Sequence, residues 1–259
     1  MRSGHQTRRP GPNHHNITDH MASELLVIHR MMACVISLSR KSVSAPPPQL
    51  HVVFRIPPLQ SGQKDYGLRA RIATSAFRPY LDAANVDLKA FQNSTYKRYV
   101  GARLQPVLDS IKEMKRLGIW LEVTTLLIPG LNDGPAELRD ATAFLAREVG
   151  RDTPWHISRF CPAWQMSDWP PTPIEALRRA REIGREEGLR HIYIGNIREE
   201  GAQDTVCPDC DRVLIRRHGF RAIANHVQDD HCPDCGAPVA GVGMNDRTRS
   251  GKQQQEPFP

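Results

Sequence analysis

The sequence contains no apolar run of the roughly 18 residues that a membrane-spanning helix requires. The nearest candidate, residues 25–38, is interrupted by His29 and Arg30. Together with the small residues at 43–45, this stretch weakly resembles a secretory signal, but the spacing of the cysteines is more typical of a cytosolic protein. We therefore expect no membrane contact and a cytoplasmic location.

Acidic residues are scarce in residues 1–75, which hold 3 Asp/Glu against 10 Lys/Arg. The other 184 residues hold 25 of each, so the net charge of +7 belongs to the N-terminal segment. A basic segment alone is weak evidence for nucleic-acid binding, and we expect no nucleic-acid partner. Residues 1–75 also lack sustained helical or alternating periodicity. They are predicted to be a poorly ordered extension, although a wrongly chosen start or out-of-frame translation would give the same composition.

The common phosphate-binding and nucleophile motifs are missing as well. The sequence has no Gly-x-Gly-x-x-Gly, no P-loop and no nucleophile elbow. From about Tyr80 onward, strand-like and helix-like segments alternate. Strands are predicted at 84–89, 119–128, 155–160 and 191–195, and helices at 107–117, 135–149 and 173–187. This order predicts, for residues 76–200, a parallel α/β sheet with right-handed crossovers. Four strands cannot close a barrel, so we expect a partial barrel.

The stretch 119–128 organises this alternation. It is long, apolar and rich in β-branched residues, and it stops at the turn signal Pro129-Gly130. A near-continuous apolar strand is expected to be covered on both faces. Asp133 is predicted to cap the helix that follows, with Pro135 in its first turn.

Two identical cysteine motifs stand near the C-terminus. Cys207-Pro-Asp-Cys210 and Cys232-Pro-Asp-Cys235 are separated by 21 residues, with short strands predicted at 213–215, 219–220 and 239–242. Four thiolates from two tight turns suit a closed tetrahedral Zn²⁺ site of structural type. A core of some 40 residues needs such a metal to fold. We predict a zinc-ribbon-like module at 201–243, with rubredoxin-like iron, disulfides or unused thiols as alternatives, and a disordered tail at 244–259.

Other candidate residues carry weaker signals. Asp87 and Lys89 lie at the carboxyl end of a predicted strand, where parallel α/β proteins bind ligands, although a solvated strand end gives the same pattern. His156 is expected to be packed or hydrogen-bonded rather than catalytic. The aromatic side chains nearby are expected to form core or a pocket wall: Trp155, Phe160, Trp164 and Trp169.

Several of these segments resemble one known family. The segments that carry this resemblance are 80–91, 99–103, 122–133, 155–160 and 171–173, together with the two Cys-Pro-x-Cys pairs and Gly241-Val242. They resemble the radical SAM protein of the AmmeMemoRadiSam system, which is similar to pyruvate formate-lyase activating enzymes. The resemblance spans roughly 78–243. It implies a partial (β/α) barrel that reductively cleaves S-adenosylmethionine at a [4Fe-4S] cluster to give a 5′-deoxyadenosyl radical. It also implies that Asp87, Leu88 and Lys89 contact S-adenosylmethionine, and that a protein or small molecule is the radical substrate.

Two departures from the family pattern bear on activity. The family's Cys-x-x-x-Cys-x-x-Cys motif is absent, and only Cys34 precedes Asp87. Cys161 stands where the family usually has a histidine, expected near the adenosyl part of the cofactor. We therefore expect a C-terminal portion of such an enzyme, inactive as written or paired with a separately encoded N-terminal half. The rival hypothesis is a non-catalytic zinc-binding scaffold or interaction protein.

Overall fold

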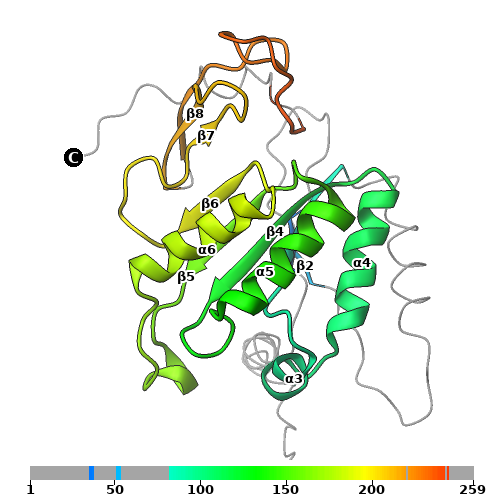
Figure 1. The fold of residues 1–259 in the computed structure, drawn as a ribbon, viewed down its shortest axis with the longest axis vertical. Coiled ribbons are helices and arrows are strands. Elements are labelled where there is room, and N and C mark those ends of the chain that lie inside the picture. Colours follow the sequence, from blue (N-terminus) through cyan, green and yellow to red (C-terminus); the bar gives the residue numbers. More distant parts are fainter. Residues whose placement is uncertain (1–34, 38–50, 54–81, 220, 243, 245–259) are drawn as a thin grey trace, which may run out of the picture.

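The computed structural model describes the backbone of residues 35–37 and 51–53 and the full residues 82–219, 221–242 and 244 (Figure 1). Its centre is a four-stranded parallel sheet in the order β3-β4-β5-β6. The strands are β3 (Ala83–Asp87), β4 (Trp120–Leu127), β5 (Trp155–Arg159) and β6 (Ile192–Gly195). The predicted alternating α/β sheet is confirmed, whereas a barrel is not formed by the described strands.

Helices connect these strands and lie on one face of the sheet, in front of it in Figure 1. After β3 come the short α3 (Asn93–Thr95) and η2 (Tyr96–Val100) and then α4 (Leu104–Arg116). After β4 come α5 (Pro135–Phe144) and η3 (Leu145–Gly150), and after β5 come η4 (Trp164–Met166) and α6 (Ile174–Glu186). The three long helices were predicted within a few residues, while α3, η2 and η4 were not.

The core lies between the helices and the face of the sheet that they cover. Alternate strand residues such as Val86, Val123 and Ile157 are fully buried against helix residues such as Ile111 and Leu177. Each such side chain contributes roughly 1.5–3 kcal/mol through removal of apolar surface from water. This packing holds the strand ends in place and so defines the edge at which the candidate site lies.

Two predictions about β4 and the turn after it are wrong. The strand β4 is not covered on both faces by the described residues, because its side chains alternate strictly between half-buried and buried. Glu122 and Thr124 occupy the half-buried face, which makes β4 a one-sided strand despite its apolar sequence. Asp133 does not cap α5. Gly134 is the N-cap, and Asp133 Oδ1 instead accepts a hydrogen bond from the Gly130 amide at 2.7 Å.

Beyond β6, a three-stranded antiparallel sheet carries the paired cysteines. It consists of β7 (Thr205–Val206), β8 (Val213–His218) and β9 (Arg221–Asn225), in that order. A second small core forms around Cys207, Cys232 and Leu214, separate from the main one. The predicted strand at 239–242 is wrong, because only Pro238 forms an isolated bridge there. Of the strand predicted at 219–220, Gly219 is a turn residue with φ of +60°, while residue 220 lies outside the described residues. We call residues 205–239 the ribbon.

Two short strands are described within residues 1–75. The strands β1 (Val35–Ser37) and β2 (His51–Val53) pair antiparallel, and β1 lies against β3. The other residues of this segment, Cys34 among them, and the tail 245–259 lie outside the described residues, as do the predictions made for them. No helix in the part of the chain that the structure describes has the length and hydropathy needed to cross a bilayer.

Candidate functional site

The two cysteine motifs form turns with the same backbone geometry. The Asp211 amide donates to the Cys207 carbonyl at 3.0 Å, and the Gly236 amide donates to the Cys232 carbonyl at 2.9 Å. Asp211 and Gly236 each have a positive φ, of 59° and 73°, at the same position after the first cysteine. Gly and Asp are among the residues that accept this left-handed conformation at least cost. The two turns therefore have the same local backbone geometry around their cysteines.

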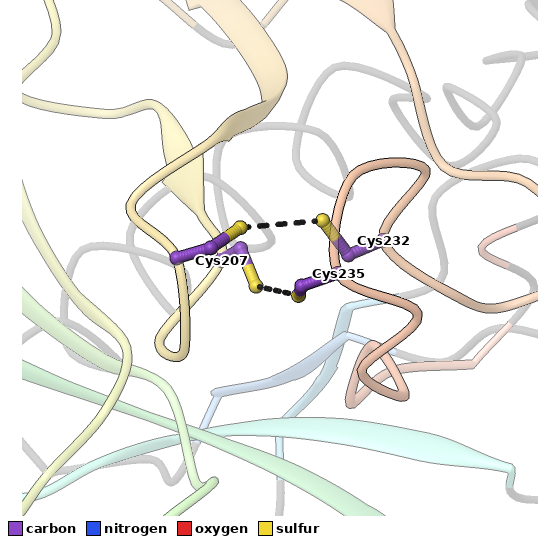
Figure 2. A group of neighbouring side chains, drawn as sticks. Cys207, Cys232 and Cys235 are labelled. Atoms are coloured by element: carbon purple, nitrogen blue, oxygen red, sulfur yellow. Dashed lines mark hydrogen bonds between the residues drawn. The ribbon is translucent and has the colours of Figure 1, made fainter.

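The four thiols meet between the two turns (Figure 2). Their sulfur atoms all lie within 4.8 Å of one another, with Cys207 Sγ 3.6 Å from Cys235 Sγ and Cys210 Sγ 3.6 Å from Cys232 Sγ. The edge of a tetrahedron with metal–sulfur bonds of about 2.3 Å is about 3.8 Å. The four cysteines can therefore bind a metal ion, in the geometry that the spacing predicted.

The electrostatics of the four thiols favour deprotonation at one of them first. Backbone hydrogen bonds from the amides of Cys235 and Asp234, opposed by desolvation, lower the pKa of Cys232 to about 7. Although the Arg212 amide acts in the opposite direction, desolvation and the neighbouring thiols raise the pKa of Cys210 to about 12. A metal cation would stabilise all four thiolates together.

Charged side chains tie the two turns to each other and to the sheet domain. Arg212 in the first turn approaches Asp234 in the second at 3.2 Å. Arg190, just before β6, lies 4.0 Å from Asp209 of the first turn. Both pairs are exposed and so worth at most about 1 kcal/mol each. The turns are therefore held in register chiefly by the ribbon's core and the shared cysteine site.

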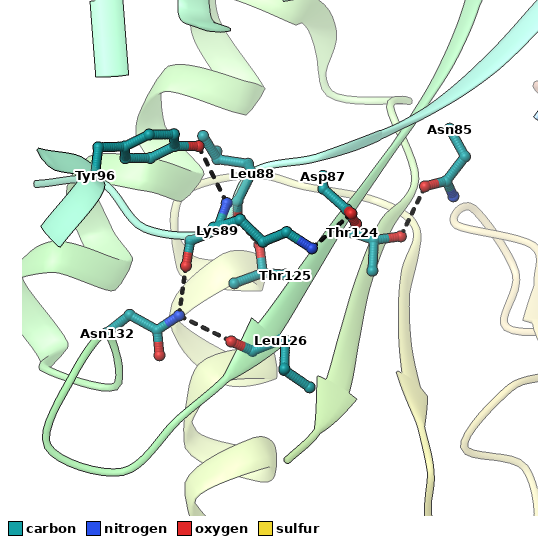
Figure 3. Close-up of polar contacts among 9 residues, drawn as sticks. All are labelled: Asn85, Asp87, Leu88, Lys89, Tyr96, Thr124, Thr125, Leu126 and Asn132. Atoms are coloured by element: carbon teal, nitrogen blue, oxygen red, sulfur yellow. Dashed lines mark hydrogen bonds and ion pairs between the residues drawn. The ribbon is translucent and has the colours of Figure 1, made fainter. Parts of the chain in front are cut away.

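A second group of polar side chains lies at the carboxyl edge of the parallel sheet (Figure 3). Asp87 ends β3, and its Oδ2 lies 2.6 Å from the ammonium of Lys89. The side chain of Lys89 is 35% exposed and that of Asp87 17% exposed. The two predicted charges thus pair with each other at a partly open strand end. Leu88, between them, is buried, and its amide donates to the Thr124 carbonyl at 2.9 Å, so it supports the loop rather than facing a ligand.

The backbone around Lys89 is fixed by side chains from three other elements (Figure 3). Asn132 Nδ2 donates to the Lys89 carbonyl at 2.7 Å and to the Leu126 carbonyl at 2.8 Å. The Lys89 amide donates to the Tyr96 hydroxyl at 3.2 Å, and the Thr125 hydroxyl donates to the Leu88 carbonyl at 3.0 Å. Because Asn132 and Tyr96 are almost completely buried, these bonds are shielded from water. The Asp87–Lys89 pair therefore stands on a preorganised loop.

The segment after Lys89 is held in the same way. Glu137, in the first turn of α5, accepts a hydrogen bond from the Phe91 amide at 2.6 Å. Burial, with the charges of Asp133 and Asp140 adding to it, raises the pKa of Glu137 above its ordinary value, while the amides of Phe91 and Gln92 act against the rise. A carboxylate at a helix N-terminus thus bridges α5 to the loop after β3.

The face of the sheet turned away from the helices carries polar side chains from every strand. We call the half-buried side chains Asn85, Asp87, Glu122, Thr124, His156 and Tyr193 the polar face. Four of them, one from each strand, form a row in the register of the sheet: Asp87, Thr124, His156 and Tyr193. Thr124 donates to Asn85 Oδ1 at 2.9 Å. The sequence signal was the pair Glu122 and Thr124, two residues apart in an otherwise apolar stretch, and the apolar content around them masked it.

His156 is the centre of the polar face. Its Nε2 lies 3.0 Å from Glu122 Oε2, and its ring stacks on Tyr193 with centroids 5.0 Å apart. Burial of Glu122 acts to raise its pKa, but the hydrogen bond and charge of His156, with hydrogen bonds from Trp120 and Asn85, leave that pKa below its ordinary value. The prediction that His156 is hydrogen-bonded is confirmed. Glu122 and Tyr193 were missed.

The remaining predicted residues are spread along the carboxyl edge. Cys161 is exposed and follows β5, two strands away from Lys89. Trp155 and Phe160 are buried as predicted, but Trp164 is 62% exposed and does not belong to the core. Trp169 makes an edge contact with Tyr99 at 6.3 Å. Asp87 and Lys89 are brought together, whereas Cys161 stands apart from them.

Comparisons with known proteins add one close sequence relative. No protein-family model matches the chain. An uncharacterized protein of the archaeon Methanocaldococcus jannaschii is 43% identical over 161 residues, which is 61% of this chain and 48% of that protein. The chain thus spans about half the length of the curated relative it matches. A crystal structure of a domain of pyruvate-formate lyase-activating enzyme from Bacteroides vulgatus aligns with a TM-score of 0.43 at 14% identity, covering 48% of this chain and 74% of that one. A likeness at that score establishes neither fold nor function.

The fold and site define an α/β protein with a four-strand parallel sheet and a four-cysteine site that can bind a metal ion. The cysteines do not fit the cluster that the resemblance implies. Cys161 is the single described cysteine outside the ribbon, and no three cysteines of the whole sequence have the spacing Cys-x-x-x-Cys-x-x-Cys. We therefore derive no reaction step through a [4Fe-4S] cluster.

Proposed function

We propose that the ribbon binds one Zn²⁺ through Cys207, Cys210, Cys232 and Cys235 in a closed, structural site. The observation that supports this proposal is the mutual approach of the four sulfur atoms within 4.8 Å. In a [4Fe-4S] cluster each thiolate binds a different iron, which requires sulfur atoms to stand further apart than around a single ion. A single tetrahedral ion suits the observed spacing. With all four positions taken by protein, the ion would have no open site for catalysis.

Metal analysis of the purified full-length chain tests this proposal. We expect about one zinc per chain and no acid-labile sulfide, and Cys232→Ser should lose the zinc. Cys161→Ser is the matched control, because Cys161 lies outside the ribbon, and it should retain the metal. Four irons with sulfide per chain, or zinc retained by Cys232→Ser, would contradict the proposal.

For the sheet we propose membership of the radical SAM family of the activating-enzyme type. The support is the resemblance over 78–243 together with a parallel sheet that carries a preorganised charge pair at its carboxyl edge. S-adenosylmethionine carries an ammonium and a carboxylate on its methionine part. Asp87 and Lys89 have the complementary charges, and they would hold these groups by exchanging their mutual ion pair for contacts with the ligand. When bound to a reduced cluster this cofactor supplies a 5′-deoxyadenosyl radical, but the cluster ligands are not in this chain.

Binding of S-adenosylmethionine by equilibrium dialysis tests the role of the charge pair. We expect Lys89→Met to weaken binding about tenfold, because one charged hydrogen bond is worth about 1.5 kcal/mol or more. Lys97→Met removes the same charge from an exposed position on η2 and should change nothing. Equal binding by the two variants, or no binding by the wild-type chain, would contradict the assignment of Asp87 and Lys89 to a site for S-adenosylmethionine.

We also propose that the chain as written does not reductively cleave S-adenosylmethionine by itself. Anaerobic reconstitution with iron and sulfide, followed by assay for 5′-deoxyadenosine, should give no turnover above a chain-free control. Turnover would mean that another set of ligands holds the cluster. The scaffold alternative is favoured by one zinc per chain combined with no detectable binding of S-adenosylmethionine.

A further inference from the structure

We propose that the ribbon, when its cysteine site is loaded with metal, positions His156 on the polar face through Arg217, Thr205 and Tyr193. This inference rests on the proposed zinc site. It assigns Arg217 and Tyr193 as positioning residues for an imidazole at the centre of the sheet. The link is a continuous series of direct contacts from the metal-binding turns to His156, and it crosses from the ribbon to the parallel sheet.

The first part of the link runs from the cysteine turns to Arg217. The strand β8 begins three residues after Cys210, and its buried residues Leu214 and Ile215 share a core with Cys207 and Cys232. The position of β8 therefore depends on the packing around the four cysteines. Arg217 lies two residues beyond Ile215 on the same strand, so displacement of this core displaces Arg217.

Arg217 is held firmly where β8 meets the sheet domain. Its amide donates to Asp204 Oδ1 at 2.7 Å. Its Nη1 donates to the Thr205 hydroxyl at 2.6 Å and to the Gln203 carbonyl at 3.0 Å. The bond to the nearly buried Asp204 carboxylate fixes the main chain of Arg217, and the two bonds from Nη1 fix its guanidinium against the segment 203–205.

The second part of the link runs from Arg217 to His156 through Tyr193. The guanidinium carbon of Arg217 lies 5.6 Å from the centre of the Tyr193 ring, within cation–π range. The Tyr193 hydroxyl and the Thr205 hydroxyl are 3.0 Å apart. The Tyr193 ring also stacks on the ring of His156, with centroids 5.0 Å apart and an interplanar angle of 23°. His156 is thus held between Tyr193 and Glu122.

Loss of the metal should release Tyr193 from its contacts with Arg217 and Thr205. A ribbon of this size buries too little apolar surface to stay folded without its metal. Arg217 and Thr205 would then leave Tyr193, and the Tyr193 hydroxyl would lose its partner. His156 would keep the hydrogen bond to Glu122, because both residues belong to the parallel sheet, but not its fixed stacking partner. The metal site thereby sets the geometry of a histidine in a different part of the fold.

Nuclear magnetic resonance of the full-length chain with labelled histidine and tyrosine tests the inference. Spectra are recorded at one pH for the metal-free and zinc-loaded protein, with His156→Gln assigning the signal. We expect cross-peaks between the His156 and Tyr193 rings in the loaded protein and their loss without metal. The indole proton of Trp155, which donates to Thr125 at 3.0 Å in the sheet core, should persist in both states and shows that the sheet stays folded.

Two arginine variants separate positioning from metal binding. Arg217→Met should retain about one zinc per chain and yet lose the His156–Tyr193 cross-peaks. Arg216→Met removes the same charge from the neighbouring, more exposed position and should keep them. Arg217→Lys should restore them only in part, because an ammonium cannot reproduce the guanidinium geometry.

The outcomes distinguish the two proposals. Unchanged cross-peaks in the metal-free protein, or in zinc-loaded Arg217→Met, would overturn the inference while leaving the zinc site intact. Failure of the wild-type chain to bind stoichiometric zinc would overturn both. Loss of the Trp155 indole signal without metal would also overturn the inference, since the metal would then support the whole fold rather than position one histidine.

Discussion

Asn132 offers a direct test of how the carboxyl edge of the sheet is built. Its side chain is 2% exposed. It donates to the carbonyls of Lys89 and Leu126 and accepts from the Ile128 amide at 2.7 Å. Asn132→Ala removes all three of these hydrogen bonds to main-chain groups. At about 1 kcal/mol of net stability for each bond, the free energy of unfolding should fall by about 3 kcal/mol.

The assay is urea unfolding at 25 °C with saturating zinc, followed by the fluorescence of the buried Trp155. Asn132→Asp has nearly the same volume but no donor for the two carbonyls, so at pH 7 it should lose at least as much stability, which separates hydrogen bonding from packing. Gln105→Ala is the control, because it removes only an exposed contact with Asp109 and should stay within about 0.5 kcal/mol of wild type. A loss below about 1 kcal/mol for Asn132→Ala would refute the assignment of these bonds as a stabilising clamp.

Further predictions concern the metal site and the polar face. Zinc binding must displace thiol protons, and because the pKa of Cys210 is raised to about 12, this thiol alone should lower the apparent zinc affinity about tenfold between pH 7 and pH 6, as measured by chelator competition. Cys232, with a pKa of about 7, should add to this fall, and a flat profile would contradict thiolate ligation. Because the pKa of Glu122 lies lower in the folded protein than its ordinary value of 4.5, its ionised form stabilises the fold above pH 4.5, and this contribution is lost as the pH falls through the folded pKa. In acid titrations followed by circular dichroism, Glu122→Gln should therefore lose less stability below pH 4.5 than wild type; parallel curves for the two proteins would argue against the pairing with His156.

Local patterns predicted much of the fold. The order of strands and helices after residue 80 followed from periodicity and from turn residues such as Gly118, which ends α4 with a φ of 73°. The cysteine site followed from spacing alone, because each Cys-Pro-Asp-Cys turn forms within six residues and fixes its two thiols by local backbone hydrogen bonds. Where the prediction failed, as at the Asp133 cap, two local partners competed for one side chain.

Local patterns did not predict the contacts between residues that are far apart in the sequence. Asn132 meets Lys89 across 43 residues, and Glu122 meets His156 across 34. Judged from the sequence alone, an asparagine after a turn and a glutamate in an apolar strand each have many possible hydrogen-bond partners. Only the register of β3, β4 and β5 brings them to their partners.

The amino-acid order therefore defines an alternating α/β region and a four-thiol site that can bind a metal ion, because both arise from interactions among near neighbours. The tertiary fold alone determines that Lys89 stands on a clamped loop, that the sheet has one polar face, and that Arg217 of the ribbon reaches Tyr193. The physical reason is that strand pairing and helix packing set these distances, and a shift of one residue in register would send every side chain of a strand to the opposite face.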